Sequence, residues 1–312
     1  MPREKLCIFC CKHSSVFVRQ QGSACGYKNA DSWVILTEIE QRIKEKIERI
    51  GTPLKDWDIQ INYGIKTGYN EAFIIDGAKR KELIEQDPKS EEIIRPILRG
   101  RDIKRYGYDF GNLWLINTHN GIKESGINAI NVEEYPAVKK HLDNFWVGLE
   151  KRADQGQTPY NLRNCAYMDD FSKQKIAYIE IMTDNPDDGY DFPSFTFDTE
   201  KCIVLNTAYI ISGKVDELKY ILGILNSKVG RILVKFYVVQ LQQRQFRMLN
   251  QYVVNFPIPK NRDFFQISRL VDKIINGKKE MKDTKSLDKK VNEIVYKLFD
   301  FSSQEIDFIE NL

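Results

Sequence analysis

The chain has 312 residues, of which 42% are hydrophobic and 29% are charged, and its formal net charge at pH 7 is +3. This composition is typical of a folded globular protein and excludes a disordered, collagen-like or disulfide-scaffold chain, and the length predicts one large domain or two modest ones. The longest stretch without Asp, Glu, Lys or Arg has 13 residues, Phe110 to Ile122, whereas a membrane-spanning helix needs about 20. We therefore expect no spanning helix. The apolar run near the N-terminus is too short for a secretion signal, which predicts a cytoplasmic protein.

The predicted elements begin with a capping box, Thr37-Glu38-Ile39-Glu40, and a helix that ends at Gly51 and Pro53. Strands are predicted where apolar residues alternate or run together, at 58–63, 72–76, 113–117, 175–182, 194–198 and 202–212. Helical periodicity covers 79–86, 133–152, 216–236, 264–276 and 287–299, and a capping box at Ser302 and Glu305 predicts a short last helix. Because strands and helices alternate without a regular βαβ rhythm, we predict an α+β fold with a mixed sheet.

These patterns divide the chain into three predicted parts. Residues 1–36 form an N-terminal lead-in, residues 37–260 a mixed-sheet domain, and residues 261–312 a helical C-terminal segment. In that segment one aliphatic stripe must be buried, and we expect it to pack back on the mixed domain under the helix from Ser303. The stripe consists of Leu287, Val291, Ile294, Val295 and Leu298.

Neither the cysteines nor any familiar motif predicts a reactive centre. A zinc site near the N-terminus is the sharpest alternative, but structural zinc sites usually have two separated ligand pairs, and Cys25 has no paired partner. The residues of that alternative are Cys7, Cys10, Cys11, His13 and Cys25. The chain contains no G-x-S-x-G, Walker A or H-E-x-x-H motif, and the N-P-D-D run at 185–188 lacks the second proline and the aromatic residue of an adenine methyltransferase loop. We therefore predict no catalytic residue, no metal ligand and no cofactor in this chain.

The charge is distributed unevenly. From Leu218 to Arg262 there is no Asp or Glu, whereas eight basic residues occur there. Because one carboxylate repels a phosphate as strongly as one lysine attracts it, this exclusion predicts a surface that meets a polyanion. Within the window, Gln240 to Arg247 is rich in Gln and Arg, whose two-pronged side chains match the major-groove edges of adenine and guanine; a solvated polar loop is the alternative. A smaller basic cluster lies at 95–105.

Several blocks of sequence carry a family resemblance. They are G-I-K-T-G-Y-N-E-A-F at 64–73, R-P-I-L-R-G-R-D-I at 95–103, Y-N-L-R at 160–163, K-Q-K-I at 173–176, L-N-S-K at 225–228 and V-Y-K-L-F at 295–299, preceded by W-V-I-L at 33–36. In this order the chain resembles the TaqI-like C-terminal specificity domain of type IIG restriction–modification enzymes, over about residues 30 to 312. The first two blocks make the resemblance specific.

The resemblance implies sequence-specific recognition of double-stranded DNA on behalf of an N6-adenine DNA methyltransferase and endonuclease. It implies that residues 1–36 remain from a longer enzyme, and that S-adenosylmethionine and Mg²⁺ are needed by that parent enzyme only. We expect the segments 95–105 and 228–247 to form the walls of the DNA groove, with Lys66 and Thr67 at a loop tip; a buried turn is the alternative for 64–73. The predicted DNA-binding residues are Lys66, Thr67, Arg99, Arg101, Lys104, Arg105, Arg163, Lys228, Arg231, Lys235, Gln242, Gln243, Arg244, Gln245 and Arg247.

Two other functions stay open at this point. In the first, the chain is a specificity subunit that docks onto a methyltransferase protein through its helical segment. In the second, it is a stand-alone nuclease or methyltransferase whose active site the motifs do not reveal. Tight binding of S-adenosylmethionine would favour the second, and co-purification with a methyltransferase without DNA affinity would favour the first.

Overall fold

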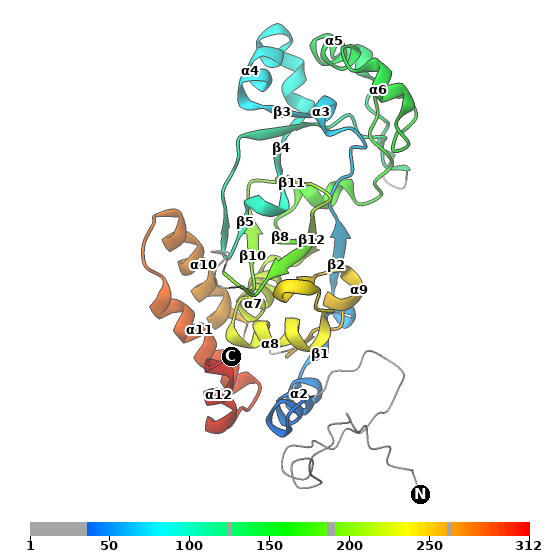
Figure 1. Ribbon diagram of the computed structural model, residues 1–312. Coiled ribbons are helices and arrows are strands. Elements are labelled where there is room, and N and C mark those ends of the chain that lie inside the picture. The colour runs from blue at the N-terminus through cyan, green and yellow to red at the C-terminus, as the bar shows by residue number, and fades with distance from the viewer. Residues whose placement is uncertain (1–35, 124–125, 186–190, 261–263) are drawn as a thin grey trace, which may run out of the picture.

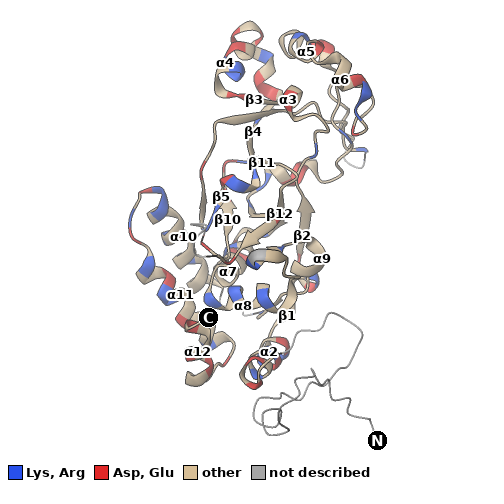
Figure 2. Ribbon diagram, in the orientation of Figure 1, with Lys and Arg blue, Asp and Glu red and all other residues tan. Residues whose placement is uncertain are grey.

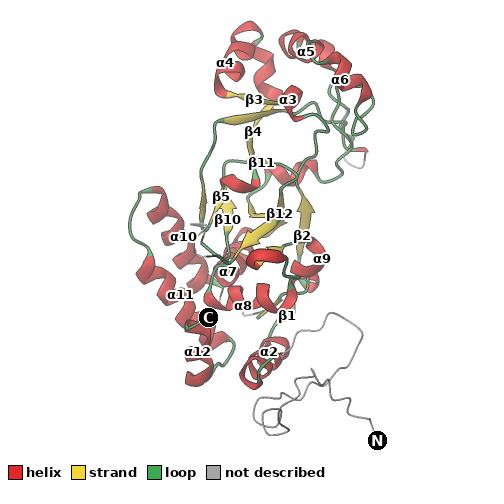
Figure 3. Cartoon of the chain, in the orientation of Figure 1, coloured by secondary structure: helices red, strands yellow, loops and turns green. Residues whose placement is uncertain are grey.

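The computed structural model describes residues 36–123, 126–185, 191–260 and 264–312. Strands occupy the middle of the molecule and helices cover both ends (Figure 3), and two hydrophobic cores lie along its length. The predicted α+β class is confirmed. No helix in the described part of the chain is long and apolar enough to cross a membrane.

The first core is built on a four-stranded antiparallel sheet with the order β10-β8-β12-β2. These strands are β2 (Ile59–Tyr63), β8 (Lys175–Ile179), β10 (Phe195–Asp198) and β12 (Ala208–Gly213). The helix α7 (Val215–Leu225) packs on this sheet and buries most of its side chains, as expected for a segment that is apolar nearly all round. The sheet order places β10 and β2 at opposite edges, and the loop after β2 carries Lys66.

The second core is built on the sheet β11-β4-β7-β3, in which β11 (Ile203–Val204) pairs in parallel with β4 (Ile94–Leu98). The other strands are β7 (Leu113–Ile116) and β3 (Ile74–Asp76). The helices around it, at the top of Figure 1, are α3 (Asn70–Phe73), α4 (Gly77–Gln86), α5 (Pro136–Asp143) and α6 (Trp146–Lys151). Because β11 and β12 follow each other in the chain, residues 205–207 connect the two sheets.

The C-terminal helices belong to the first core. They are α8 (Lys228–Tyr237), α10 (Phe265–Lys279), α11 (Lys285–Leu298) and α12 (Ser303–Glu310), with α2 (Glu38–Ile50) beside them (Figure 1). Val291 and Val295 are buried against α7 and α8, so the stripe packs back on the mixed domain as predicted. The helix from Ser303, which was predicted to cover the stripe, packs against α8 and α2. Both predicted capping boxes are present, at Thr37 and at Ser302.

Three short pairs of strands complete the described elements. β1 (Thr52–Pro53) pairs with β14 (Pro257–Ile258), β5 (Ile103–Lys104) with β6 (Gly107–Tyr108), and β9 (Ile181–Thr183) with β13 (Gln245–Arg247), all antiparallel. The helix α9 (Asn250–Val253) follows β13. The pair β9–β13 brings the Gln/Arg segment of the sequence to the end of β8.

Several predicted elements are divided in the structure. The strand predicted at 175–182 is divided at Glu180, because residues up to Ile179 pair with β12 whereas Ile181–Thr183 pairs with β13. The helix predicted at 216–236 breaks at Asn226 and Ser227, because the Asn226 amide binds the backbone of Phe195 and the Ser227 hydroxyl caps α8. Residues 133–152 form two helices, and the strand predicted at 72–76 is a helical turn up to Phe73.

Some predictions fall outside the described residues. These are the N-terminal cysteines with His13, the block at 33–35, most of the run 185–188, and Arg262. Within the described ranges, Cys165 and Cys202 are buried free thiols, and no group of three or more His, Cys, Asp or Glu side chains is arranged to hold a metal ion.

Candidate nucleic-acid interface

The loop after β2 owes its shape to two glycines. The Ile65 N–H donates to the carbonyl of Val204, 2.8 Å away, which draws the loop against the chain between the two sheets. A Cβ on Gly64 would lie 2.1 Å from the carbonyl oxygen of Leu205, so only glycine fits there. Gly68 has φ +71°, a conformation that other residues rarely adopt. The two glycines of the G-x-x-x-G spacing therefore allow the backbone of this loop to lie close against the backbone at Val204 and Leu205.

Thr67 is buried, in contrast to the prediction that it lies at a loop tip. Its hydroxyl donates to Asn70 and accepts from the N–H of Tyr69. The buried guanidinium of Arg152 binds the carbonyl of Thr67 and, from the facing loop, the carbonyls of Asp154, Pro159 and Asn161. Thr67 thus belongs to the support of the loop and presents no group to a ligand.

Lys66 and Arg163 share one carboxylate. The Nζ of Lys66 lies 2.9 Å from Asp154 Oδ2, and Nη1 of Arg163 lies 3.2 Å from Asp154 Oδ1. Hydrogen bonding to Lys66 lowers the pKa of Asp154, so the carboxylate is charged at neutral pH. Because Asp154 also gives its carbonyl to Arg152, the pair of cations is held by a rigid part of the loop.

The loop 205–207 joins three segments of the candidate interface. The N–H of Asn206 donates to the carbonyl of Ile65 at 3.0 Å, and the Glu180 N–H donates to the carbonyl of Thr207 at 2.9 Å. The hydroxyl of Thr207 accepts from the N–H of Gly100, also at 2.9 Å. The loop after β2, the end of β8 and the turn that carries Arg101 therefore meet at this point.

Tyr63 links the two charged ends of this surface. Burial raises the pKa of the Tyr63 hydroxyl, and the negative charge of Glu180 raises it further. A hydrogen bond with Asn206 and the positive charges of Lys66 and Arg247 lower it. The Tyr63 ring packs edge-on against Tyr209, with ring centroids 5.0 Å apart. Because the loop 205–207 bonds both to Ile65 and to Glu180, the partner of Arg247, the segments that carry Lys66 and Arg247 lie beside the same loop.

Arg247 and Gln245 point to the same side of β13. Phe246, between them, is buried, and side chains alternate along a strand. The Nε of Arg247 lies 2.9 Å from Glu180 Oε1, and the N–H of Met248 binds the carbonyl of Glu180. The outward side of β13 therefore carries Arg247 beside Glu180, at the end of β8.

One buried carboxylate collects three cations beyond β13. Asp184, at 6% exposure, lies 2.5 Å from Nη2 of Arg231, 3.2 Å from Nζ of Lys235 and 3.2 Å from Nη2 of Arg244. Arg231 and Lys235 come from α8, along which basic residues recur (Figure 2), and both are largely buried. Arg244 remains about half exposed.

Four cations thus form what we call the cationic arc, which consists of Lys66, Arg163, Arg247 and Arg244. Their side chains are 49%, 55%, 52% and 53% exposed, and each is held by Asp154, Glu180 or Asp184. The segment from Leu218 to Arg262 contains no Asp or Glu, but in the structure Glu180 and Asp184 lie against its cations. The carboxylates that hold the arc come from outside the window, and sequence alone offered no signal for them or for Tyr63 and Asn206.

The other predicted site residues are distributed differently. The prediction that Arg105 lines the DNA groove is wrong. Its side chain is mostly buried and binds Asp288 of α11 and the carbonyl of Asn226. Arg99 is held by Asp102 with a bidentate contact, and Lys228 binds Glu310 of α12. Lys104 lies 3.9 Å from Asp109. Arg101 is exposed beside the loop 205–207, and Gln242 is exposed at the turn before β13; Gln243 lies in the same turn.

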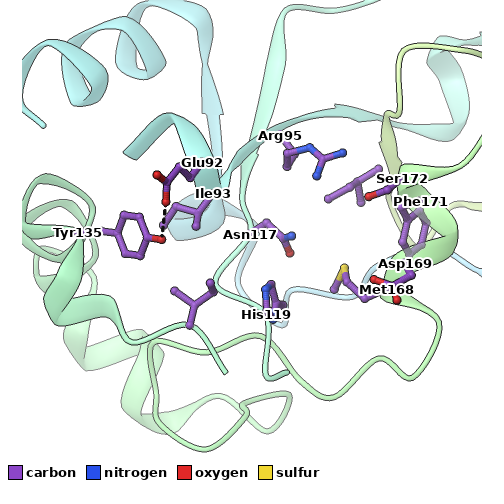
Figure 4. A pocket seen from close by; sticks show the side chains of 12 residues that line it. Glu92, Ile93, Arg95, Asn117, His119, Tyr135, Met168, Asp169, Phe171 and Ser172 are labelled. Atoms are coloured by element: carbon purple, nitrogen blue, oxygen red, sulfur yellow. Dashed lines mark hydrogen bonds between the residues drawn. The ribbon is translucent and has the colours of Figure 1, made fainter. Parts of the chain in front are cut away.

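A cavity of about 330 Å³ lies elsewhere on the molecule (Figure 4). Asn117, His119 and Arg95 line one side, and Met168 and Asp169 line the other. Its residues Ile93 and Arg95 are at the start of β4, whereas Arg99 and the loop 205–207 follow the ends of β4 and β11. None of the described residues that line this cavity is a member of the cationic arc.

Comparison with solved structures identifies a shared fold. The chain superimposes on the type IIL restriction–modification enzyme MmeI, solved in complex with DNA, with a TM-score of 0.60 and 14% sequence identity, over 83% of this chain and 36% of MmeI. A second similar structure is the type IIG restriction endonuclease BpuSI, with a TM-score of 0.49 and 14% identity, over 84% of this chain and 33% of BpuSI. The chain thus spans about a third of either enzyme, and it has the fold found in a restriction–modification enzyme.

The family model of the TaqI-like C-terminal specificity domain matches residues 95–258, which is more than half of the chain. The chain therefore belongs to this family, and its function is DNA target recognition. The matched range contains three members of the cationic arc, together with Glu180, Asp184 and the loop 205–207. The family predicted from the sequence and the predicted recognition of a DNA target are confirmed.

Proposed function

We propose that this chain directs an N6-adenine DNA methyltransferase, with an associated endonuclease, to a particular site on double-stranded DNA, and that the cationic arc is the surface that meets the DNA. Phosphate contacts orient such a domain and contacts to base edges specify the sequence. S-adenosylmethionine and Mg²⁺ belong, in this proposal, to the catalytic part of the parent enzyme. The solved complex of MmeI with DNA supports DNA as the ligand.

The observation that carries the proposal is the arc itself. Its four cations come from three segments of the chain, the loop after β2, the loop that contains Arg163 and the run 244–247, and their side chains stay about half exposed. Together with Arg231 and Lys235 they outnumber the three carboxylates that hold them, so the face keeps a surplus of positive charge. A cation already held in place loses less side-chain entropy when it binds a phosphate.

The interface is tested by removing two members of the arc. In the full chain, Arg163→Ala with Arg247→Ala should lower the affinity for a mixed-sequence duplex about tenfold or more at 50 mM salt, measured by fluorescence anisotropy. The matched control is Arg80→Ala, because Arg80 also pairs with a carboxylate, Glu91 at 2.7 Å, but lies on α4 at the far end of the molecule. An equal loss from the control would place the interface elsewhere.

The catalytic half of the proposal is tested in the parent enzyme. Exchanging this domain for that of a relative with a different target should change which adenines are methylated, as read by sequencing methylated DNA. Methylation of the original sites after the exchange would mean that specificity resides outside this domain. Absence of N6-methyladenine in DNA treated with the intact parent enzyme would contradict the assigned chemistry.

A further inference from the structure

A closed turn precedes β13 and contains most of the Gln/Arg segment. Gln240 forms a bridge with Phe246, and the N–H of Leu241 donates to the carbonyl of Gln245 at 2.7 Å. Between these contacts residues 242–244 make one turn of 3₁₀-helix. We call residues 241–245 the readout turn. Its tip presents Gln242 and Arg244 to solvent.

Asp184 holds this turn through its backbone and its side chain. Its N–H donates to the carbonyl of Arg244 at 3.0 Å, while its carboxylate binds the guanidinium of the same residue. From α8, where residues four apart lie on one face, Arg231 binds Oδ1 of the carboxylate and Lys235 binds Oδ2, the oxygen that also meets Arg244. Because Asp184 is buried, these ion pairs are screened much less than surface pairs. The carboxylate is thus fixed to a helix and in turn fixes Arg244.

The backbone of Arg244 adds an independent observation. Its φ is +59°, in the left-handed region that few residues other than glycine adopt. Strained backbone of this kind persists where neighbouring contacts determine it, and it is concentrated at functional sites. A long cationic side chain therefore stands at a position where glycine would relieve the strain.

We infer that Asp184 is a positioning residue for sequence readout, which aims Arg244 at the O6 and N7 edge of a guanine, and that Arg231 and Lys235 support Asp184 instead of binding DNA. The inference rests on the proposed DNA-binding role of the cationic arc. Bidentate recognition of guanine needs a guanidinium in a defined orientation. A buried carboxylate supplies that orientation before DNA arrives.

The test separates positioning from simple charge. In the full chain, Asp184→Asn keeps the shape of the side chain and removes its charge. Preference for guanine at one position should fall about five- to 150-fold in a selection from randomised duplexes. Affinity for mixed-sequence duplex should stay equal or rise, because a negative charge has left the face. A merely structural role would lower both quantities together, and that result would overturn the inference.

A double-variant cycle tests whether Asp184 acts through Arg244. Arg244→Asn removes the guanidinium and retains a residue that tolerates the left-handed conformation. Adding Asp184→Asn to it should change base preference no further, because the effects of coupled residues do not add. Independent, additive losses of preference would overturn the inference.

Two controls keep the outcomes distinct. Asp288→Asn also removes a carboxylate from an arginine, Arg105, and should leave base preference unchanged. If Asp184→Asn does not fold, Asp184→Glu keeps the charge, displaces the carboxylate by one methylene, and carries the same expectation for preference. Failure of the proposed function itself would look different, since the unmodified chain would then show no salt-dependent DNA binding.

Discussion

Replacing Lys66 by Gln gives the most direct measure of the proposed interface. Each phosphate that a cation neutralises contributes about −0.9 to the slope of log affinity against log salt. If Lys66, Arg163 and Arg247 each meet one phosphate while Arg244 reads a base, the slope is about −2.7, and affinity falls about 40-fold between 50 and 200 mM NaCl. Lys66→Gln should bring the slope to about −1.8 and the fall to about 12-fold. Fluorescence anisotropy with a mixed-sequence duplex of about 20 base pairs measures both.

Lys89→Gln is the matched control for this prediction. Lys89 is 42% exposed and lies 2.7 Å from Glu134, whereas Lys66 is 49% exposed and lies 2.9 Å from Asp154. Lys89 precedes β4, at the end of that strand away from the arc. Its replacement should leave the slope unchanged. Equal changes in slope for the two variants would refute the assignment of the arc.

Four further predictions concern stability and strain. Arg244→Gly should leave the unfolding free energy unchanged or raise it by up to about 1 kcal/mol, because glycine relieves the positive φ, while base preference is lost. Arg152→Ala should cost about 3 kcal/mol or more in urea unfolding, because several carbonyls lose a buried charged donor, whereas Arg163→Ala should cost less than about 0.5 kcal/mol. Burial lowers the pKa of His141 below 6.5, so the unfolded chain binds more protons than the folded chain, and the free energy of unfolding should fall as the pH drops through 6.5. His141→Gln should reduce this fall, as measured by the melting temperature at a series of pH values. A chain that ends at residue 260 should lose its cooperative thermal transition, because α10 and α11 complete the first core; an unchanged melting temperature would contradict this.

Local patterns predicted much of the fold correctly. The capping boxes at Thr37 and Ser302 and the stripe that includes Val291 and Val295 each concern residues within a turn or two of one another. Hydrogen-bond geometry and side-chain periodicity act over that distance, so a single sequence reveals them. Element ends were predicted less well, because β9 leaves the partner of β8 to pair with β13, and Asn226 binds the backbone of Phe195; no local pattern indicates partners so distant in sequence.

The candidate site was likewise predicted where residues close in sequence determine it, and was missed where distant residues do. The sequence by itself determined which segments are basic, that the Gln/Arg run has base-reading side chains, and that the chain resembles a DNA specificity domain. Only the tertiary structure decided which cations face outward. Arg105 meets Asp288, 183 positions later in the chain, and is buried, whereas Lys66 and Arg163 stay exposed around Asp154. The physical reason is that an ion pair depends on distance in space, and the carboxylates that hold or bury each cation come from elements far apart in sequence.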